Sequence, residues 1–264
     1  MTVDQRNSLT GRPRPLPVAL VRDGESAGAA AIAEDGRRAC YPPRSLIFLE
    51  GDRAETVFQV ESGAVMLYML LPDGRRQIVE ILGPGDAFGF SSSALHDASA
   101  ETLTATRCIA FERSAVERSP ALMTRLSARL HAQLCALHDH IMLLGRKSSM
   151  ERIASFLIRC VPGRGGPACP GRPAGAADRA DIRLAMTRYG IADYLGLTIE
   201  TVSRSFARLK RRGIVSISKI DEISIRDVCE LCRLTGTHLS CELGGVRPRA
   251  WPARRADAAR GATR

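Results

Sequence analysis

The stretch Met186–Lys210 reads MTRYGIADYLGLTIETVSRSFARLK and divides into two short segments with helical periodicity. Each segment carries three apolar residues at helical spacing, which are Ile191, Ala192 and Leu195 in the first and Val202, Phe206 and Leu209 in the second. The break falls at Gly196, which can adopt a tight turn, and Thr198 stands where a side-chain oxygen caps a second helix. The stretch therefore predicts a helix-turn-helix, a motif that places its second helix in the major groove of DNA.

The first turns of the second predicted helix carry side chains that suit base recognition. Arg204 can donate two hydrogen bonds to guanine, Glu200 can accept one from cytosine, and Ser203 is short enough for close approach. Glu200 and Arg204 are four residues apart, so a simple exposed ion pair is the alternative explanation. From Met186 to Ile220, seven Lys or Arg stand against Asp193 and Glu200, a net charge of +5 that favours phosphate contacts.

The composition agrees with a soluble protein of two ordinary domains, because the chain has 264 residues and 45% apolar content. Its net charge of +10 favours an anionic partner. The sequence has no run of about 18 apolar residues and no secretion signal, so we expect a cytoplasmic protein without a membrane partner. Motifs typical of enzymes, such as a phosphate-binding loop, G-x-S-x-G or H-E-x-x-H, are missing from it, which argues against catalysis.

Short β-type runs dominate the region that follows an expected disordered tail over residues 1–35. The predicted strands are Ser45–Glu50, Val57–Val60, Ala64–Leu71, Gln77–Leu82 and Ala100–Phe111. Turn signals separate them, and Asp73-Gly74 between two apolar runs is a strong hairpin signal. Residues 36–119 are therefore expected to form a β-roll or sandwich, and the whole chain an α+β fold.

A long helix is predicted over residues 120–146, where apolar residues recur every three or four positions. They are expected to form a dimerisation seam and comprise Met123, Leu126, Leu130, Leu134, Leu137, Ile141 and Leu144. A single helix packed on its own domain is the alternative. Because reading an inverted repeat requires two protomers, the dimer is the preferred interpretation.

The remaining residues 147–240 are expected to form a winged helix-turn-helix domain. Ser148 and Glu151 have capping-box spacing at the start of its first helix. Residues 162–181 contain four Pro and five Gly and predict a flexible insertion. Ile214–Ile217 and Glu222–Ile225 predict a two-stranded wing whose tip places Lys219 near a phosphate. Residues 241–264 are expected to be a basic, disordered tail.

The segment Glu200-Thr-Val-Ser-Arg204 resembles the DNA-binding helices of the CRP/FNR family, in the E-x-x-S-R form typical of its FNR and FixK branches. The predicted roll is similar to the cyclic-nucleotide-binding domain of that family through Gly51-Asp52, Gly63, Gly74 and Gly85-Asp86-Ala87-Phe88-Gly89. The resemblance implies a transcription regulator, with an activator preferred, in which Glu200, Ser203 and Arg204 read TTGA-like half-sites of an inverted repeat. It also implies backbone contacts by Thr187, Arg188, Thr198 and Thr201.

The same resemblance bears on ligands and partners. Phe90 and Ser91 stand where nucleotide-binding relatives carry Glu, and Ala98-Ser99-Ala100 replaces Arg-Ser/Thr-Ala, so we expect no response to cyclic AMP. The first 39 residues contain no cysteine, so the iron-sulfur cluster of FNR relatives is not expected and the FixK-type branch is favoured. No cofactor is therefore predicted. The hairpin Asp73–Arg76 lies where FNR relatives contact RNA polymerase, although Arg75 and Arg76 replace acidic character there.

The cysteines suggest an alternative to a regulator without a cofactor. In this alternative the protein is a redox- or ligand-sensing module in which a cysteine thiol or a bound metal controls binding. Cys160 and Cys169 flank the predicted insertion and are the candidate redox thiols. Four soft ligands, Cys229, Cys232, His238 and Cys241, lie within thirteen residues and could enclose zinc. Cys229 and Cys232 equally suit the inner face of a helix, so the sequence leaves metal binding open.

Overall fold

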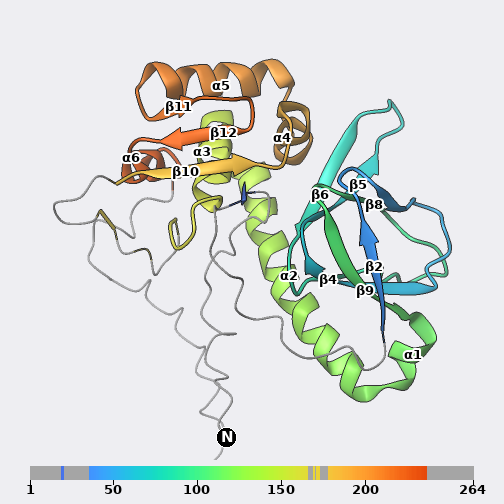
Figure 1. Cartoon of the computed structure of the whole chain (residues 1–264). Helices are drawn as coiled ribbons and strands as arrows, with labels where there is room; N and C mark the ends of the chain where they lie inside the picture. The colour runs from blue at the N-terminus through green and yellow to red at the C-terminus, as the bar shows by residue number, and fades with distance from the viewer. Residues whose placement is uncertain (1–18, 21–35, 166–168, 170, 173–177, 237–264) are drawn as a thin grey trace, which may run out of the picture.

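The computed structural model describes residues 19–20, 36–165, 169, 171–172 and 178–236. The fold is α+β, with a β-roll, a long helix along one side of it, and a winged helix-turn-helix domain at the end of that helix (Figure 1). The roll consists of two four-stranded sheets, ordered β2-β9-β4-β7 and β3-β8-β5-β6. Its strands are β2 (Arg37–Tyr41), β3 (Leu46–Phe48), β4 (Thr56–Ser62), β5 (Val65–Leu70), β6 (Arg76–Leu82), β7 (Ala87–Phe88), β8 (Ser99–Thr102) and β9 (Thr106–Glu112).

The roll closes because alternate side chains of both sheets meet in one apolar core. A single strand was predicted over Ala100–Phe111, where the structure has the two strands β8 and β9, so this prediction is wrong. The chain turns between them, where the Leu103 amide donates to the Ala64 carbonyl at 2.8 Å, and it crosses from one sheet to the other. Gly63 makes this turn possible, because its φ is +92° and a Cβ there would lie 2.5 Å from the Ala105 carbonyl oxygen.

A short helix, α1 (Arg113–Arg118), which sequence analysis missed, leads into the 27-residue helix α2 (Pro120–Arg146). The Ser119 side chain caps α2 by accepting from the Leu122 amide, and Pro120 occupies its first turn. One side of α2 packs on the roll and buries Leu122, Leu126, Gln133, His140 and Leu143. Gln133 fixes this contact, since its side chain both donates to and accepts from the backbone of Ala87 at 3.0 Å.

Leu126 therefore requires a correction. It was predicted at the dimer seam, but it is fully buried in a cluster with Val57, Phe111 and Val116 of the same protomer. Helical periodicity gave the positions of the apolar residues on α2 but could not separate those that face the roll from those that face outward. Leu134 and Ile141 are exposed, whereas Met123, Leu130, Leu137 and Leu144 are half-buried.

The C-terminal domain combines four helices with a small antiparallel sheet, β1-β10-β12-β11. The Ser148–Glu151 capping box predicted from sequence is present at the start of its first helix. Its remaining elements are β1 (Ala19–Leu20), α3 (Ser149–Arg159), β10 (Ala180–Leu184), α4 (Arg188–Leu195), α5 (Ile199–Arg211), β11 (Val215–Ile217), β12 (Glu222–Ile225) and α6 (Val228–Arg233).

In two segments that were expected to be disordered or flexible, described residues pair with distant parts of the chain. Ala19–Leu20, within the expected N-terminal tail, pairs with Leu184 and Arg183 as an edge strand. The expected insertion 162–181 contains the start of β10, and its Arg164 and Asp178 form an almost fully buried ion pair at 2.7 Å. Gly and Pro content lowers local helix propensity but carries no information about such pairing over a distance.

The roll and the C-terminal domain share one hydrophobic cluster, which we call the shared core. The roll contributes four of its side chains, which are Met66, Tyr68, Ile78 and Ile81. They pack with residues of α2, α3, α4 and α5, including Leu143, Phe156, Ile191, Tyr194 and Phe206. At its edge, Arg76 Nε donates to Asp193 of α4 at 2.9 Å, and its guanidinium also lies 3.6 Å from Glu101. The contact fixes α4 relative to the roll.

His140 of α2 stacks on Tyr194 of α4, with ring centroids 4.2 Å apart, beside this core. Burial, followed by the charge of Arg159, lowers the pKa of His140 to about 4. The unfolded chain, with an ordinary histidine pKa near 6.5, takes up the proton first. Stability should therefore be highest above pH 6.5 and fall progressively toward pH 4, by about 3 kcal/mol in total from this residue.

The expected result is that His140→Phe, which can still stack on Tyr194, loses less unfolding free energy than the unsubstituted protein between pH 7.5 and pH 5. Urea unfolding at both pH values measures this difference. The same loss in both proteins would contradict the assignment of the pH dependence to His140.

Candidate nucleic-acid interface

Local caps build the helix-turn-helix as the sequence predicted. The Thr187 hydroxyl accepts from the Gly190 amide at 3.2 Å and starts α4. Gly196 ends α4 in the left-handed conformation, with φ of +59°. The Thr198 hydroxyl then accepts from the Thr201 amide at 3.3 Å and starts α5. These contacts confirm the predicted turn and hold the two helices at a fixed angle.

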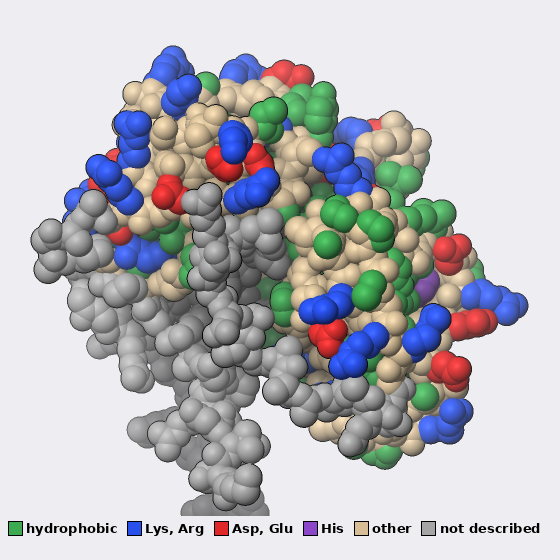
Figure 2. All heavy atoms as spheres, viewed as in Figure 1, with side chains coloured by type: hydrophobic (Ala, Val, Ile, Leu, Met, Phe, Trp, Pro, Cys, Tyr) green, Lys and Arg blue, Asp and Glu red, His purple; other side chains and the backbone are tan. Residues whose placement is uncertain are grey.

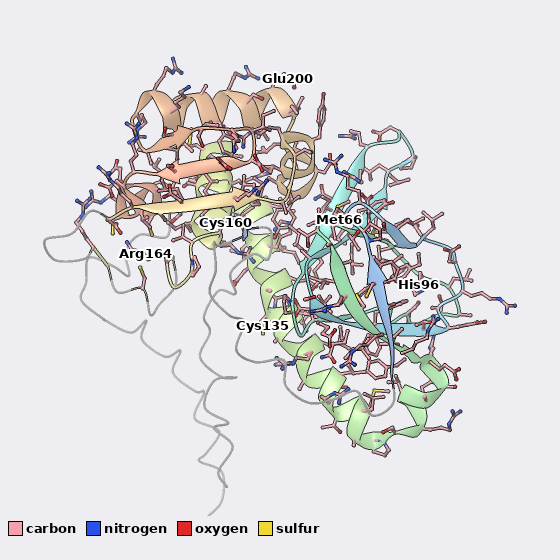
Figure 3. All side chains as sticks on the ribbon, viewed as in Figure 1. Met66, His96, Cys135, Cys160, Arg164 and Glu200 are labelled. Carbon is pink, nitrogen blue, oxygen red and sulfur yellow. The ribbon has the colours of Figure 1, made fainter. Side chains whose placement is uncertain are left out.

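Helix α5 separates its apolar and polar residues onto opposite sides. The buried side consists of Val202, Ser205, Phe206 and Leu209, which pack into the shared core or beside it. Glu200, Ser203 and Arg204 are all exposed on the other side, where they line a shallow hollow together with Ile199. Glu200 lies at the end of α5 next to α4, on the outer surface of the molecule (Figure 3). The structure thus brings the three predicted base-reading residues together.

Glu200 and Arg204 do not form the simple ion pair that was the alternative explanation for their spacing. Arg204 Nε donates to the backbone carbonyl of Glu200 at 3.3 Å. The pKa of Glu200 is lowered by its own backbone amide and then by the Thr198 hydroxyl, so its carboxylate stays ionised. An ionised acceptor and a guanidinium donor are therefore presented side by side, as reading of both donors and acceptors on base edges requires.

Basic side chains continue beyond these three residues. Arg208, Lys210 and Arg211 are exposed on the last turns of α5. Figure 2 shows Lys and Arg side chains gathered over α5 and the neighbouring end of the wing sheet. This arrangement suits a phosphate backbone on either side of a groove that holds α5.

The predicted backbone-contacting residues are in different environments. Thr187 and Thr198 are exposed at helix N-termini, a position that favours phosphate, and Thr201 is half-buried beside Thr198. Arg188 instead lies over the ring of Phe206, 3.4 Å from its centroid, and burial lowers its pKa to about 10. Lys219, at the wing tip, pairs with Glu222 at 3.0 Å while remaining largely exposed. Arg188 consequently has a packing role that the sequence did not indicate.

Arg152 is a positioning residue that sequence analysis missed. It lies on α3 and donates to the carbonyls of Leu144 at 2.6 Å, Lys147 at 2.9 Å and Leu195 at 2.9 Å. These carbonyls belong to the C-terminal ends of α2 and α4, which carry unsatisfied acceptors. One guanidinium thus joins the long helix to the DNA-reading pair, and no local sequence signal marks this contact.

The structure does not support Cys160 as a redox thiol. Its side chain is 1% exposed, Sγ donates to the Phe156 carbonyl at 3.3 Å, and burial raises its pKa to about 12. Figure 3 places it inside the C-terminal domain. Cys169 is half-buried. Cys160 directly follows α3 and is buried with Phe156 and Leu157 of that helix.

The candidate zinc ligands are only partly described. Cys229 and Cys232 lie on α6, where Cys232 is buried and Cys229 accepts from Arg164 at 3.3 Å. His238 and Cys241 lie outside the described residues. Within the ranges that the structure covers, we find no group of three or more His, Cys, Asp or Glu side chains placed to hold a metal.

Aromatic side chains lie in the interior of the roll. Phe48 stacks on His96 with ring centroids 3.6 Å apart, and Phe58 stacks on Phe88 at 5.1 Å. Ser91, at a position that was compared with the nucleotide-binding Glu, donates to the Leu95 carbonyl at 2.6 Å. Its hydroxyl therefore stabilises its own loop.

Comparisons with known proteins agree with this architecture. A family described as cyclic nucleotide-binding domain matches residues 38–119, and one described as Crp-like helix-turn-helix domain matches residues 151–234. The nitrogen fixation regulation protein FixK of Rhizobium meliloti is 38% identical over 203 residues, which are 76% of this chain and 88% of that protein. The transcriptional activator protein anr of Pseudomonas aeruginosa is 33% identical, over 73% of this chain and 78% of that protein.

Among solved structures, FixK2 of Bradyrhizobium japonicum is 36% identical and superposes with a TM-score of 0.62. The match covers 75% of this chain and 96% of that structure. None of the helices in the described ranges has the length and apolar character needed to cross a membrane. The roll, the long helix and the capped DNA-reading pair all lie in the matched regions, and the chain belongs to the CRP/FNR family of DNA-binding transcription regulators.

Proposed function

We propose that this regulator binds TTGA-type inverted repeats as a homodimer in the cytoplasm and activates transcription by contacting RNA polymerase. The observation that carries the proposal is the joint exposure of Glu200, Ser203 and Arg204 on one side of the capped helix α5. The names of two relatives, anr and the transcriptional activatory protein AadR of Rhodopseudomonas palustris, support activation.

A dimer is needed because half-sites of an inverted repeat lie about 34 Å apart, one turn of the DNA, on a twofold axis. Helix α2 offers the surface for it, since its side away from the roll carries exposed Leu134 and Ile141. The half-buried leucines of the predicted seam, Leu130, Leu137 and Leu144, lie beside these two.

The polymerase contact is assigned to the tip of the β5–β6 hairpin. Met69, Leu70 and Leu71 are exposed there, next to the Asp73–Arg75 ion pair. Arg76 is excluded from this contact because it is held by Asp193 and Glu101.

Cyclic AMP is expected to leave operator affinity unchanged, because aromatic rings lie inside the roll and Ala98 stands in place of the arginine that would pair with a phosphate. Fluorescence anisotropy of a labelled operator, with and without millimolar nucleotide, measures this. A tenfold increase in operator affinity on addition of the nucleotide would contradict the expectation that the roll binds no cyclic AMP.

Selection of bound sites from random duplex DNA tests the proposed function directly. The expected product is an inverted repeat with TTGA-like half-sites whose centres are one helical turn apart. Recovery of single half-sites, or of arbitrary sequences at physiological salt, would contradict it.

A further inference from the structure

The side of α2 that faces away from the roll carries exposed residues at a regular spacing. Every third or fourth residue falls on one line, which we call the outer line and which consists of Ser127, His131, Leu134, His138, Ile141 and Gly145. All six are exposed, including Leu134 at 48% and Ile141 at 63%. Alternation of three and four is the spacing that keeps a helix in contact with a second helix along its length.

The composition of this side fits another copy of the same helix. No residue of the outer line is Asp, Glu, Lys or Arg. It is flanked on one side by exposed Ala128, Cys135 and Met142, and on the other by half-buried Leu130, Leu137 and Leu144. Figure 3 places Cys135 on the flank of α2 away from the roll. A 27-residue helix is about 40 Å long, enough for three heptads of contact.

We infer that a second copy docks along the outer line in parallel, so that His131 and His138 each meet their counterparts across the twofold axis and their protonation opens the dimer. The inference rests on the proposed homodimer along α2 and adds its control by pH. In a twofold parallel pair, a residue at the centre of the contact lies opposite itself. Two histidine pairs, one heptad apart, therefore alternate with the Leu134 and Ile141 pairs along the contact.

Other titratable groups near these histidines do not offset the added charge. On the exposed side of α2 they are Cys135, between the two histidines, and a single carboxylate, Asp139, beside His138. The roll and α3 pack on the other side of α2. There the Gln133 amide donates a hydrogen bond to Glu80, and Lys147 donates one to the Ser155 hydroxyl. His140 also faces that side and titrates only near pH 4, so it stays neutral in the folded protein at pH 5.5.

Neutral histidine pairs can be accommodated between helices, whereas two facing imidazolium ions repel each other as like charges do. Histidine ordinarily changes charge between pH 5 and 8. Four new positive charges along one seam would therefore weaken the dimer as the pH falls through this range.

Sedimentation velocity of the full chain at pH 7.5 and pH 5.5, in buffers with EDTA, tests the pH dependence. We expect the dimer dissociation constant to rise at least tenfold at pH 5.5, and to change less than threefold in the double variant His131→Leu/His138→Leu. Asp139→Asn, a neighbouring exposed change off the line, is the matched control and should keep at least the tenfold shift. The double variant retains His140, so destabilisation from that residue affects both proteins equally.

A charge-exchange experiment tests whether His131 faces itself. His131→Glu and His131→Lys should each form dimers at least tenfold more weakly at pH 7.5, and an equimolar mixture should restore them as heterodimers. Circular dichroism confirms that each variant is folded. Failure of the mixture to associate, or an unsubstituted dimer that ignores pH, would overturn the inference. A protein that is monomeric at pH 7.5 would instead overturn the proposed dimeric function.

Discussion

Replacing Arg204 with alanine should weaken binding to a TTGA-containing inverted repeat by about 1 to 3 kcal/mol per half-site and relax the choice of base at one position. The guanidinium is exposed in the hollow on α5, where its fork of donors suits guanine. Glu200→Ala should show a similar loss, because its ionised carboxylate accepts where Arg204 donates. Gel-shift titrations on the operator and on each singly substituted operator measure both effects.

Arg211→Ala is the matched control, since Arg211 is exposed on the last turn of α5 and should contact only phosphate. It is expected to weaken all duplexes alike and to reduce the salt dependence of binding by about one charge. Arg188→Ala should also weaken all DNA, but it removes packing on Phe206 as well and is therefore a poorer control. If Arg204→Ala lowered affinity equally for every duplex, base reading by Arg204 would be wrong.

Replacing Asp178 with alanine is expected to lower the free energy of unfolding by about 3 to 5 kcal/mol, because it leaves a buried arginine without its counter-charge. The side chains of Arg164 and Asp178 are only 10% and 5% exposed. Asp178 also accepts from the Cys229 amide at 2.8 Å and so holds the start of α6. Urea unfolding followed by circular dichroism measures the loss.

The double variant Arg164→Met/Asp178→Leu separates the effect of losing the ion pair from the effect of leaving one buried charge unpaired. It removes both charges and should lose only about 1 to 2 kcal/mol, mainly from the unsatisfied amide at α6. An Asp178→Ala loss below about 0.5 kcal/mol, the range of ordinary surface changes, would support the mobile insertion that the Gly and Pro content predicted.

The DNA-reading helices could be predicted from the sequence because everything that defines them is local. Gly196 ends one helix, Thr198 starts the next, and the apolar spacing of each is complete within a few residues. The three base-reading candidates come together for the same reason, since residues three and four apart on a helix share a side. The wing strands were also located closely, as β11 and β12.

What the sequence could not indicate depends on contacts between distant residues. Leu126 was assigned to the wrong partner because periodicity does not say whether the roll or a second protomer covers it. Arg152 and Arg164 find their acceptors on other elements, so neither has a local signature. Arg188 packs on Phe206 eighteen positions later, and only the folded helix pair brings the two together.

The shared core has a consequence for how such regulators can be recombined. Four side chains of the roll pack in the same core as the C-terminal domain, namely Met66, Tyr68, Ile78 and Ile81. Arg76 of the roll forms an ion pair with Asp193 of α4 at the boundary. A chimera that grafts this reader onto another sensor would expose Tyr194 and its neighbours unless the foreign roll presents a matching apolar face. The roll and the C-terminal domain are therefore expected to evolve together and not to be exchanged separately between related regulators.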